Sequence, residues 1–166
     1  MSRKNNYNCV EDIVESADNW RKAAYCINNE KDALELESNI LLLFSSELYL
    51  KAILIMEGKA YKKNHSLYKM FHSIDGNKQK QLKKNIIVDS REYIDLAGEV
   101  HDFSDFDKSL KYISNGFVKY RYGFEIIMKN KGFIVLPDFI REYNDELECM
   151  VKKELKVIDK TIKEKK

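Results

Sequence analysis

The chain has 166 residues, of which 44% are hydrophobic and 34% charged, and its formal net charge is +2. This length suits one domain around a single core, and the composition excludes a disordered chain. So small a net charge excludes a polycation that binds nucleic acid through its total charge. With one proline and six glycines, helix breakers are scarce, so we expect long helices rather than a sheet protein with many turns.

Charge is unevenly distributed along the chain. Residues 59–84 hold eight lysines, two histidines and one acid, whereas residues 86–110 hold seven acids and two basic residues. Such a dipolar chain can present a basic face without a basic total. Two interpretations remain open: two solvated helix faces of opposite sign, or one surface that faces phosphates.

Cysteine usage and hydropathy bear on the compartment. Cys9, Cys26 and Cys149 are widely separated, and no pair has zinc-ligand spacing. With no secretory signal ahead of them, we expect reduced, mostly buried thiols. The most apolar stretch, residues 39–56, contains charged side chains that would cost several kcal/mol in hydrocarbon. The sequence therefore predicts a soluble, cytoplasmic protein that does not bind a membrane and carries no metal or other cofactor.

The first predicted helix covers residues 10–27, after a polar segment over 1–8 that we expect to be frayed. Its buried side should consist of residues at helical spacing, namely Ile13, Ala17, Trp20, Ala24 and Ile27. A second helix is expected over 33–57, capped by Asp32 and closed by Gly58. Because this helix is apolar on almost every side, it should lie in the middle of a bundle.

The remaining predicted helices cover residues 66–73, 78–100, 106–131 and 138–162. Gly76 precedes the second of these, Asp105 caps the third, and a short extended linker ending at Pro137 precedes the fourth. The third carries an apolar stripe formed by Leu110, Ile113, Phe117, Tyr120, Phe124 and Ile127. No segment alternates like a strand. The sequence predicts an all-α, antiparallel bundle of five to six helices in a single domain over residues 1–166, with residues 163–166 frayed.

Three segments carry motifs that are short individually but ordered. Residues 45–54 on the second helix read Ser-Ser-Glu-Leu-Tyr-Leu-Lys-Ala-Ile-Leu, residues 65–67 read His-Ser-Leu at a helix start, and residues 120–125 read Tyr-Arg-Tyr-Gly-Phe-Glu. In this order and spacing they resemble a prokaryotic branch of the HEPN family, over about two-thirds of the chain from Trp20 to Glu125.

The resemblance implies an HEPN-like helical bundle that forms a homodimer and binds RNA or a nucleotide. Family members act in toxin–antitoxin pairs and antiviral defence, so a cognate antitoxin or another defence protein is the expected partner. Many are metal-independent endoribonucleases, and others are non-catalytic modules that bind proteins. The ribonucleases share an arginine followed four to six residues later by a histidine. Here no histidine follows Arg121, Glu125 stands on the same helix face instead, and nine residues separate Arg91 from His101.

Side-chain chemistry and the resemblance together select the candidate site. The candidate catalytic residues are Arg121, His65 and Glu125, and the candidate ligand-binding residues are Glu47, Lys51, Tyr122, Lys62 and Lys63. Glu47 and Lys51 are four apart and share a helix face, as do Arg121 and Glu125. If the helices pack together, Glu47 could pair with Arg121, and Lys51 with Glu125. This would be either a buried ion-pair network that fixes helix register, or a cleft in which Arg121 and Lys51 bind phosphate.

His65 stands just before Ser66, a good N-cap residue, beside several lysines. It could serve as a general acid or base near neutral pH, or its ring could pack over the helix start and bond a carbonyl. His72 is expected to be a packing residue.

If RNA is cleaved, a neighbouring 2′-hydroxyl would be the nucleophile, with His65 or Glu125 as the base. Tyr112 and Tyr122 could stack on bases, although core packing explains aromatic residues in this helix equally well. A small-ligand sensor whose dimer geometry responds to a nucleotide is a third interpretation.

Overall fold

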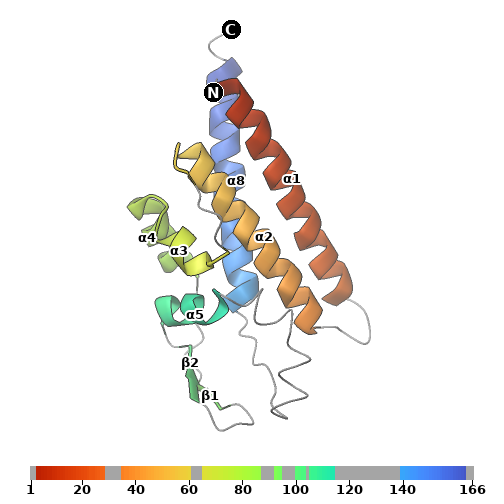
Figure 1. Cartoon of the computed structure of the whole chain (residues 1–166), viewed down its shortest axis with the longest axis vertical. Coiled ribbons are helices and arrows are strands. Elements are labelled where there is room, and N and C mark those ends of the chain that lie inside the picture. The colour runs from red at the N-terminus through yellow and green to blue at the C-terminus, as the bar shows by residue number, and fades with distance from the viewer. Residues whose placement is uncertain are drawn as a thin grey trace.

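The computed structural model describes residues 3–28, 35–60, 65–86, 92–94, 100–103, 105–114 and 139–163. These ranges contain six helices and one two-stranded hairpin (Figure 1). The long helices are α1 (Arg3–Asn28), α2 (Glu35–Met56) and α8 (Phe139–Lys163); the short ones are α3 (Leu67–Phe71), α4 (Gly76–Asn85) and α5 (Phe106–Ile113). α1 begins and α8 ends at the same end of the bundle. The predicted all-α bundle is confirmed.

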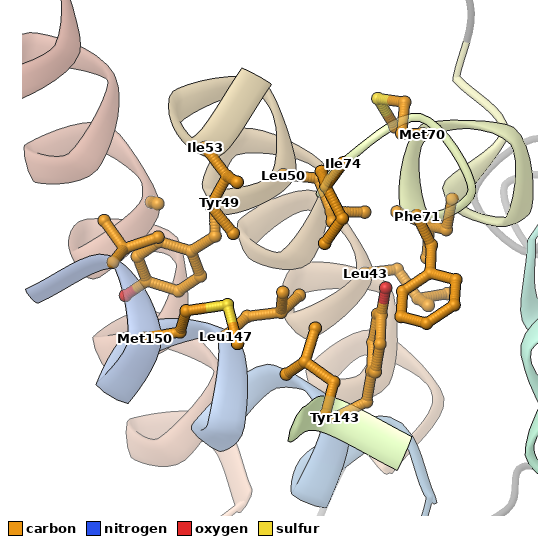
Figure 2. Packing of buried hydrophobic residues seen from close by; sticks show 14 of the residues in the cluster. Leu43, Tyr49, Leu50, Ile53, Met70, Phe71, Ile74, Tyr143, Leu147 and Met150 are labelled. Carbon is orange, nitrogen blue, oxygen red and sulfur yellow. The ribbon is translucent and has the colours of Figure 1, made fainter. Parts of the chain in front are cut away.

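Helix α2 lies in the middle of the bundle, as its apolar composition predicts. It packs against α1, α8 and α3, and its side chains are buried toward all three neighbours. Figure 2 shows Leu43, Tyr49 and Ile53 of α2 packed with Phe71 of α3 and Leu147 of α8. A helix that is apolar on almost every side can bury each side against a different neighbouring helix.

The segment Glu37–Met56 of α2 is long and apolar enough to cross a membrane by length and composition. In the structure, 61% of it is buried inside the bundle. The core helix of a soluble protein has the same length and composition, so this segment is weak evidence for a membrane span.

A glycine cap ends α2, as predicted. Gly58 has a φ of 70°, in the left-handed region that favours glycine. Its N–H donates to the Ile55 carbonyl at 2.9 Å, and the N–H of Lys59 donates to the Leu54 carbonyl at 2.8 Å. These two bonds satisfy carbonyls that the helix end would otherwise leave unpaired. The predicted cap at the other end, Asp32, lies outside the described residues.

The predicted helix over 78–100 is wrong beyond Asn85. Helix α4 begins at Gly76 with Asp75 as its N-cap and ends at Asn85, and the chain is extended at Ile86 (ψ 119°). Three β-branched residues follow one another here in the sequence, and such residues disfavour helix. Beyond them β1 (Glu92–Ile94) and β2 (Val100–Asp102) pair antiparallel.

Helix α5 begins where predicted but ends earlier. The Asp105 carboxylate accepts a hydrogen bond from the Lys108 N–H at 3.0 Å, which confirms the predicted cap. Leu110 and Ile113 of the predicted stripe are buried. The helix ends at Ile113 rather than continuing to residue 131, and the rest of the stripe lies outside the described residues.

Helix α1 ends at Asn28 as predicted but begins at Arg3, before the predicted start. Ala17 and Ala24 are fully buried, whereas Trp20 is 42% exposed and stacks on Phe44 with ring centroids 5.5 Å apart. The prediction that Trp20 lies in the core is therefore wrong. Small alanines let α1 lie close to α2, which leaves the large indole at the edge of the contact.

All three cysteines, Cys9, Cys26 and Cys149, are exposed free thiols. The prediction that they are mostly buried is wrong. Each lies on α1 or α8 away from the apolar stripe that the helix turns toward the core.

A buried polar contact joins α8 to α2. Asn144 donates through Nδ2 to the Leu42 carbonyl at 3.1 Å and to Ser46 Oγ at 2.9 Å. The neighbouring Tyr143 is also fully buried, but among the described residues its hydroxyl has no hydrogen-bonding partner. Burial raises the pKa of Tyr143, so its hydroxyl remains neutral.

These two neighbours give a matched pair of substitutions. Asn144→Ala should lower the free energy of unfolding by about 1–3 kcal/mol, because it removes two buried hydrogen bonds and opens a small cavity. Tyr143→Phe should leave the stability unchanged or slightly higher, because the lost hydroxyl makes no bond. Urea denaturation of both variants measures the difference. An equal loss in the two variants would show that the Tyr143 hydroxyl is hydrogen-bonded in solution.

Candidate functional site

Glu47, Lys51 and His65 meet beside the start of α3. Lys51 lies one turn after Glu47 on α2, and its ammonium donates a hydrogen bond to Glu47 Oε1. His65 reaches the same carboxylate from the segment before α3, with its Nδ1 at 3.0 Å from Oε1 and 3.1 Å from Oε2. Three of the predicted site residues are thus in contact with one another.

The three side chains differ in exposure. Glu47 is 7% exposed, Lys51 17% and His65 60%. A carboxylate buried this deeply is costly unless it is paired, and here it has one partner from its own helix and one from another element. The carboxylate therefore anchors an imidazole that stands largely in solvent.

The Glu47 contact fixes which nitrogen of His65 carries a proton. A carboxylate only accepts hydrogen bonds, so Nδ1 is the donor, and the lone pair of the neutral ring lies on Nε2. Such a ring can take a proton at Nε2 and return it, as general acid–base catalysis requires. The described contact of the ring is with a side chain of α2, and the expected bond to a carbonyl stays a prediction.

The start of α3 positions His65. Ser66 is the N-cap, with extended backbone (φ −79°, ψ 106°), and its hydroxyl accepts from the Lys69 N–H at 3.4 Å. Leu67, Met70 and Phe71 are buried against the bundle. The short predicted helix is confirmed, and it holds the preceding residue against α2.

Acids on other elements partly neutralise the lysine-rich stretch over residues 59–84. Lys59 and Lys78 both contact Glu57 at 2.8 Å, and Lys78 also contacts Glu154 of α8 at 2.7 Å. Burial alone would raise the pKa of Glu57, but hydrogen bonds from Lys59, Lys78 and the backbone N–H of Asp75 outweigh it and lower that pKa. The described part of this stretch is thus no continuous basic face.

Other predicted residues have packing roles. His72 ends α3, its ring lies 4.3 Å from that of Tyr68, and its Nε2 is 3.4 Å from Asp107. Tyr112 is half-buried and packs edge-on against Phe103 at 4.9 Å. Both observations favour the packing interpretation over ligand contact.

The remaining candidates lie outside the described residues: Arg121, Tyr122, Glu125, Lys62 and Lys63. The pairing of Glu47 with Arg121, and of Lys51 with Glu125, therefore stays a prediction. The contact that sequence reasoning missed is the one between His65 and Glu47, which are eighteen positions apart. The available signal was the one acid within the apolar stretch over residues 39–56, because a charge in such a stretch requires a partner.

Metal ligation has no support in the described part of the chain, where no group of three or more His, Cys, Asp or Glu residues could hold an ion.

The tautomer of His65 can be measured directly. In the neutral ring the proton should lie on Nδ1, and Glu47→Ala should move it mainly to Nε2, as in free histidine. Long-range ¹⁵N–¹H correlation spectra, recorded about two pH units above the ordinary histidine pKa, distinguish the two forms. Lys51→Met is the matched control. It also removes a partner of the Glu47 carboxylate, but it leaves in place the carboxylate that bonds the imidazole. An unchanged tautomer in Glu47→Ala would mean that another group holds the ring.

Three comparisons with known proteins were negative. No protein-family model, curated protein sequence or solved structure matches the chain.

Proposed function

We propose that the chain is an HEPN-like RNA-binding protein in which Glu47, Lys51 and His65 form part of a metal-independent endoribonuclease site. The observation that carries this proposal is the exposed imidazole of His65, held through Nδ1 by a buried carboxylate beside an ammonium. The imidazole supplies acid–base chemistry, and the ammonium supplies positive charge for a phosphate.

The reaction follows from these groups. His65 Nε2 takes the proton of a ribose 2′-hydroxyl, and the 2′-oxygen attacks the adjacent phosphorus. The bond from phosphorus to the 5′-oxygen breaks, and that oxygen leaves with a proton from solvent. The products are a 2′,3′-cyclic phosphate and a 5′-hydroxyl, and neither a metal nor an oxidant takes part. Glu47 stabilises the imidazolium that forms.

The sequence resemblance supplies the other roles. Arg121 is the proposed bidentate phosphate contact, with Glu125 as a second base and Tyr122 as a stacking surface. Lys62 and Lys63 extend the phosphate contacts next to His65. The resemblance also supports a homodimer that acts in bacterial defence or in a toxin–antitoxin pair, and the expected location is the cytoplasm.

A second candidate function is a non-catalytic HEPN module that binds protein. The observation that favours it is Trp20, exposed on α1 and stacked on Phe44. Three further apolar residues on the Phe44 side of α2 are each only partly buried: Ile40, Leu48 and Ile55. We call this the α1–α2 strip. Tryptophan in an apolar setting is enriched among residues that dominate protein interfaces.

An assay with single-stranded RNA and total tRNA in EDTA tests the ribonuclease proposal. Wild type should cleave and leave 2′,3′-cyclic phosphate ends, and His65→Ala should lose at least about 100-fold in rate, as removal of a general base does. Arg121→Ala should also lose activity. His72→Ala is the matched control, because His72 flanks α3 at its other end and should retain the wild-type rate.

Two outcomes would reject the assigned chemistry. Equal rates for His65→Ala and wild type would remove His65 from the reaction. Absence of cleavage over a wide range of protein concentration would leave the non-catalytic module as the better account.

Self-association tests the second candidate, with a second copy of the chain as the partner that the resemblance implies. If the α1–α2 strip is the interface, Trp20→Glu should weaken the dimer at least about tenfold in sedimentation velocity, as loss of an interface tryptophan does. Val157→Glu is the matched control, because Val157 is 61% exposed on α8, away from the strip. A dimer that survives Trp20→Glu unchanged would exclude the strip as its interface.

A further inference from the structure

Helix α3 needs outside support at its N-terminus. It has five residues, and an isolated helix of this length is not stable in water. The first N–H groups of a helix have no partner within it. The cap from Ser66 to the Lys69 N–H is long, at 3.4 Å, so it satisfies this end only weakly.

Ser114, the C-cap of α5, supplies that support. Its hydroxyl accepts a hydrogen bond from the Tyr68 N–H at 2.9 Å and shares a second bond with the Ser66 hydroxyl at 2.7 Å. Its carbonyl accepts from the Leu67 N–H at 3.4 Å. Ser114 is 4% exposed, so these bonds form away from solvent. One residue therefore holds three consecutive positions at the start of α3.

We propose that Ser114 is the positioning residue of the site: by fixing the backbone of residues 66–68, it holds the His65 imidazole on Glu47. The catalytic consequence rests on the proposed ribonuclease function, whereas the geometric consequence does not.

The exposure of His65 is the main argument. Its side chain is 60% exposed, so packing around the ring does not hold it in place. Two of the described contacts bear on its position: the Glu47 carboxylate, and the backbone that follows the ring. Glu47 is anchored by the core helix α2, and the backbone after His65 is anchored by Ser114. Loss of either contact should loosen the hold on the imidazole.

The same contact lies at the end of α5. Ser114 is the C-cap of α5 and keeps helical dihedral angles (φ −59°, ψ −32°), while its carbonyl and its hydroxyl bond residues at the start of α3. Ser114 is thus the junction between the element that carries His65 and the segment in which Arg121 is predicted.

The experiment compares three serine variants of the full chain. Ser114→Ala removes the hydroxyl, and Ser114→Thr keeps it. Ser109→Ala is the matched control, because Ser109 is a fully buried serine on α5 whose hydroxyl donates to the Phe103 carbonyl at 3.1 Å and not to α3. The readouts are the His65 tautomer from ¹⁵N–¹H correlation spectra, amide hydrogen exchange at Tyr68, and the RNA cleavage rate.

Ser114→Ala should shift the neutral His65 ring toward the Nε2–H form and speed amide exchange at Tyr68 at least about tenfold, because that amide loses its acceptor. If RNA is cleaved, kcat should fall by about tenfold to 100-fold with a smaller change in KM, as misplacement of a reacting group does. Ser114→Thr should keep the wild-type His65 tautomer and the wild-type amide exchange at Tyr68. Ser109→Ala should lower stability while leaving the tautomer unchanged.

The inference is overturned if Ser114→Ala keeps the wild-type tautomer and Tyr68 exchange, or if Ser109→Ala alters them equally. The two spectroscopic readouts need no RNA. A tautomer that responds in a protein that cleaves no RNA would keep the positioning role and reject the proposed function. RNA cleavage at the wild-type rate in Ser114→Ala would keep the proposed function and reject the positioning role of Ser114 in it.

Discussion

The buried carboxylate of Glu47 constrains the arrangement around α2 more than any other single group. It is a buried charged side chain in a helix whose buried residues are otherwise uncharged, and an unpaired charge there would be costly. Lys51, one turn away, compensates part of that charge, and His65 adds a contact from a different element. The rotation of α2 and the place of α3 are therefore coupled through one carboxylate.

On its other sides, α2 is positioned by close packing against α1 and by a buried polar contact with α8. Ala17 and Ala24 are fully buried and let α1 approach closely, which displaces Trp20 to the edge of the contact. On α8, the amide of Asn144 bonds the Leu42 carbonyl and Ser46, so sliding α8 along α2 would break both bonds. The bundle thus combines a non-directional apolar core with a few directional contacts that select one alignment.

The helix ends that depend on a capping residue could be predicted from the sequence. Gly58, Ser66 and Asp105 each end or begin a helix as expected, because a cap is set by the residue and its immediate neighbours. The helix expected over 78–100 failed where β-branched residues outweighed an otherwise helical pattern. The early end of α5 at Ile113 coincides with a local turn signal in the sequence, Ser-Asn-Gly over residues 114–116, which the apolar stripe outweighed in the prediction. The pairing of His65 with Glu47 is tertiary, although both residues stood out in the sequence.

If the proposed site is functional, its residues contribute to stability and to chemistry in different proportions. Removing Glu47 would leave Lys51, at 17% exposure, close to the core without its carboxylate, so folding and chemistry would change together. His65 is mostly exposed and contributes little to the core, so its loss should report on chemistry alone. A charge network kept only for helix register has no need of an exposed imidazole, because Lys51 on the same helix already pairs with the buried carboxylate. The exposure of His65 is therefore the feature that favours a functional site over a purely structural one.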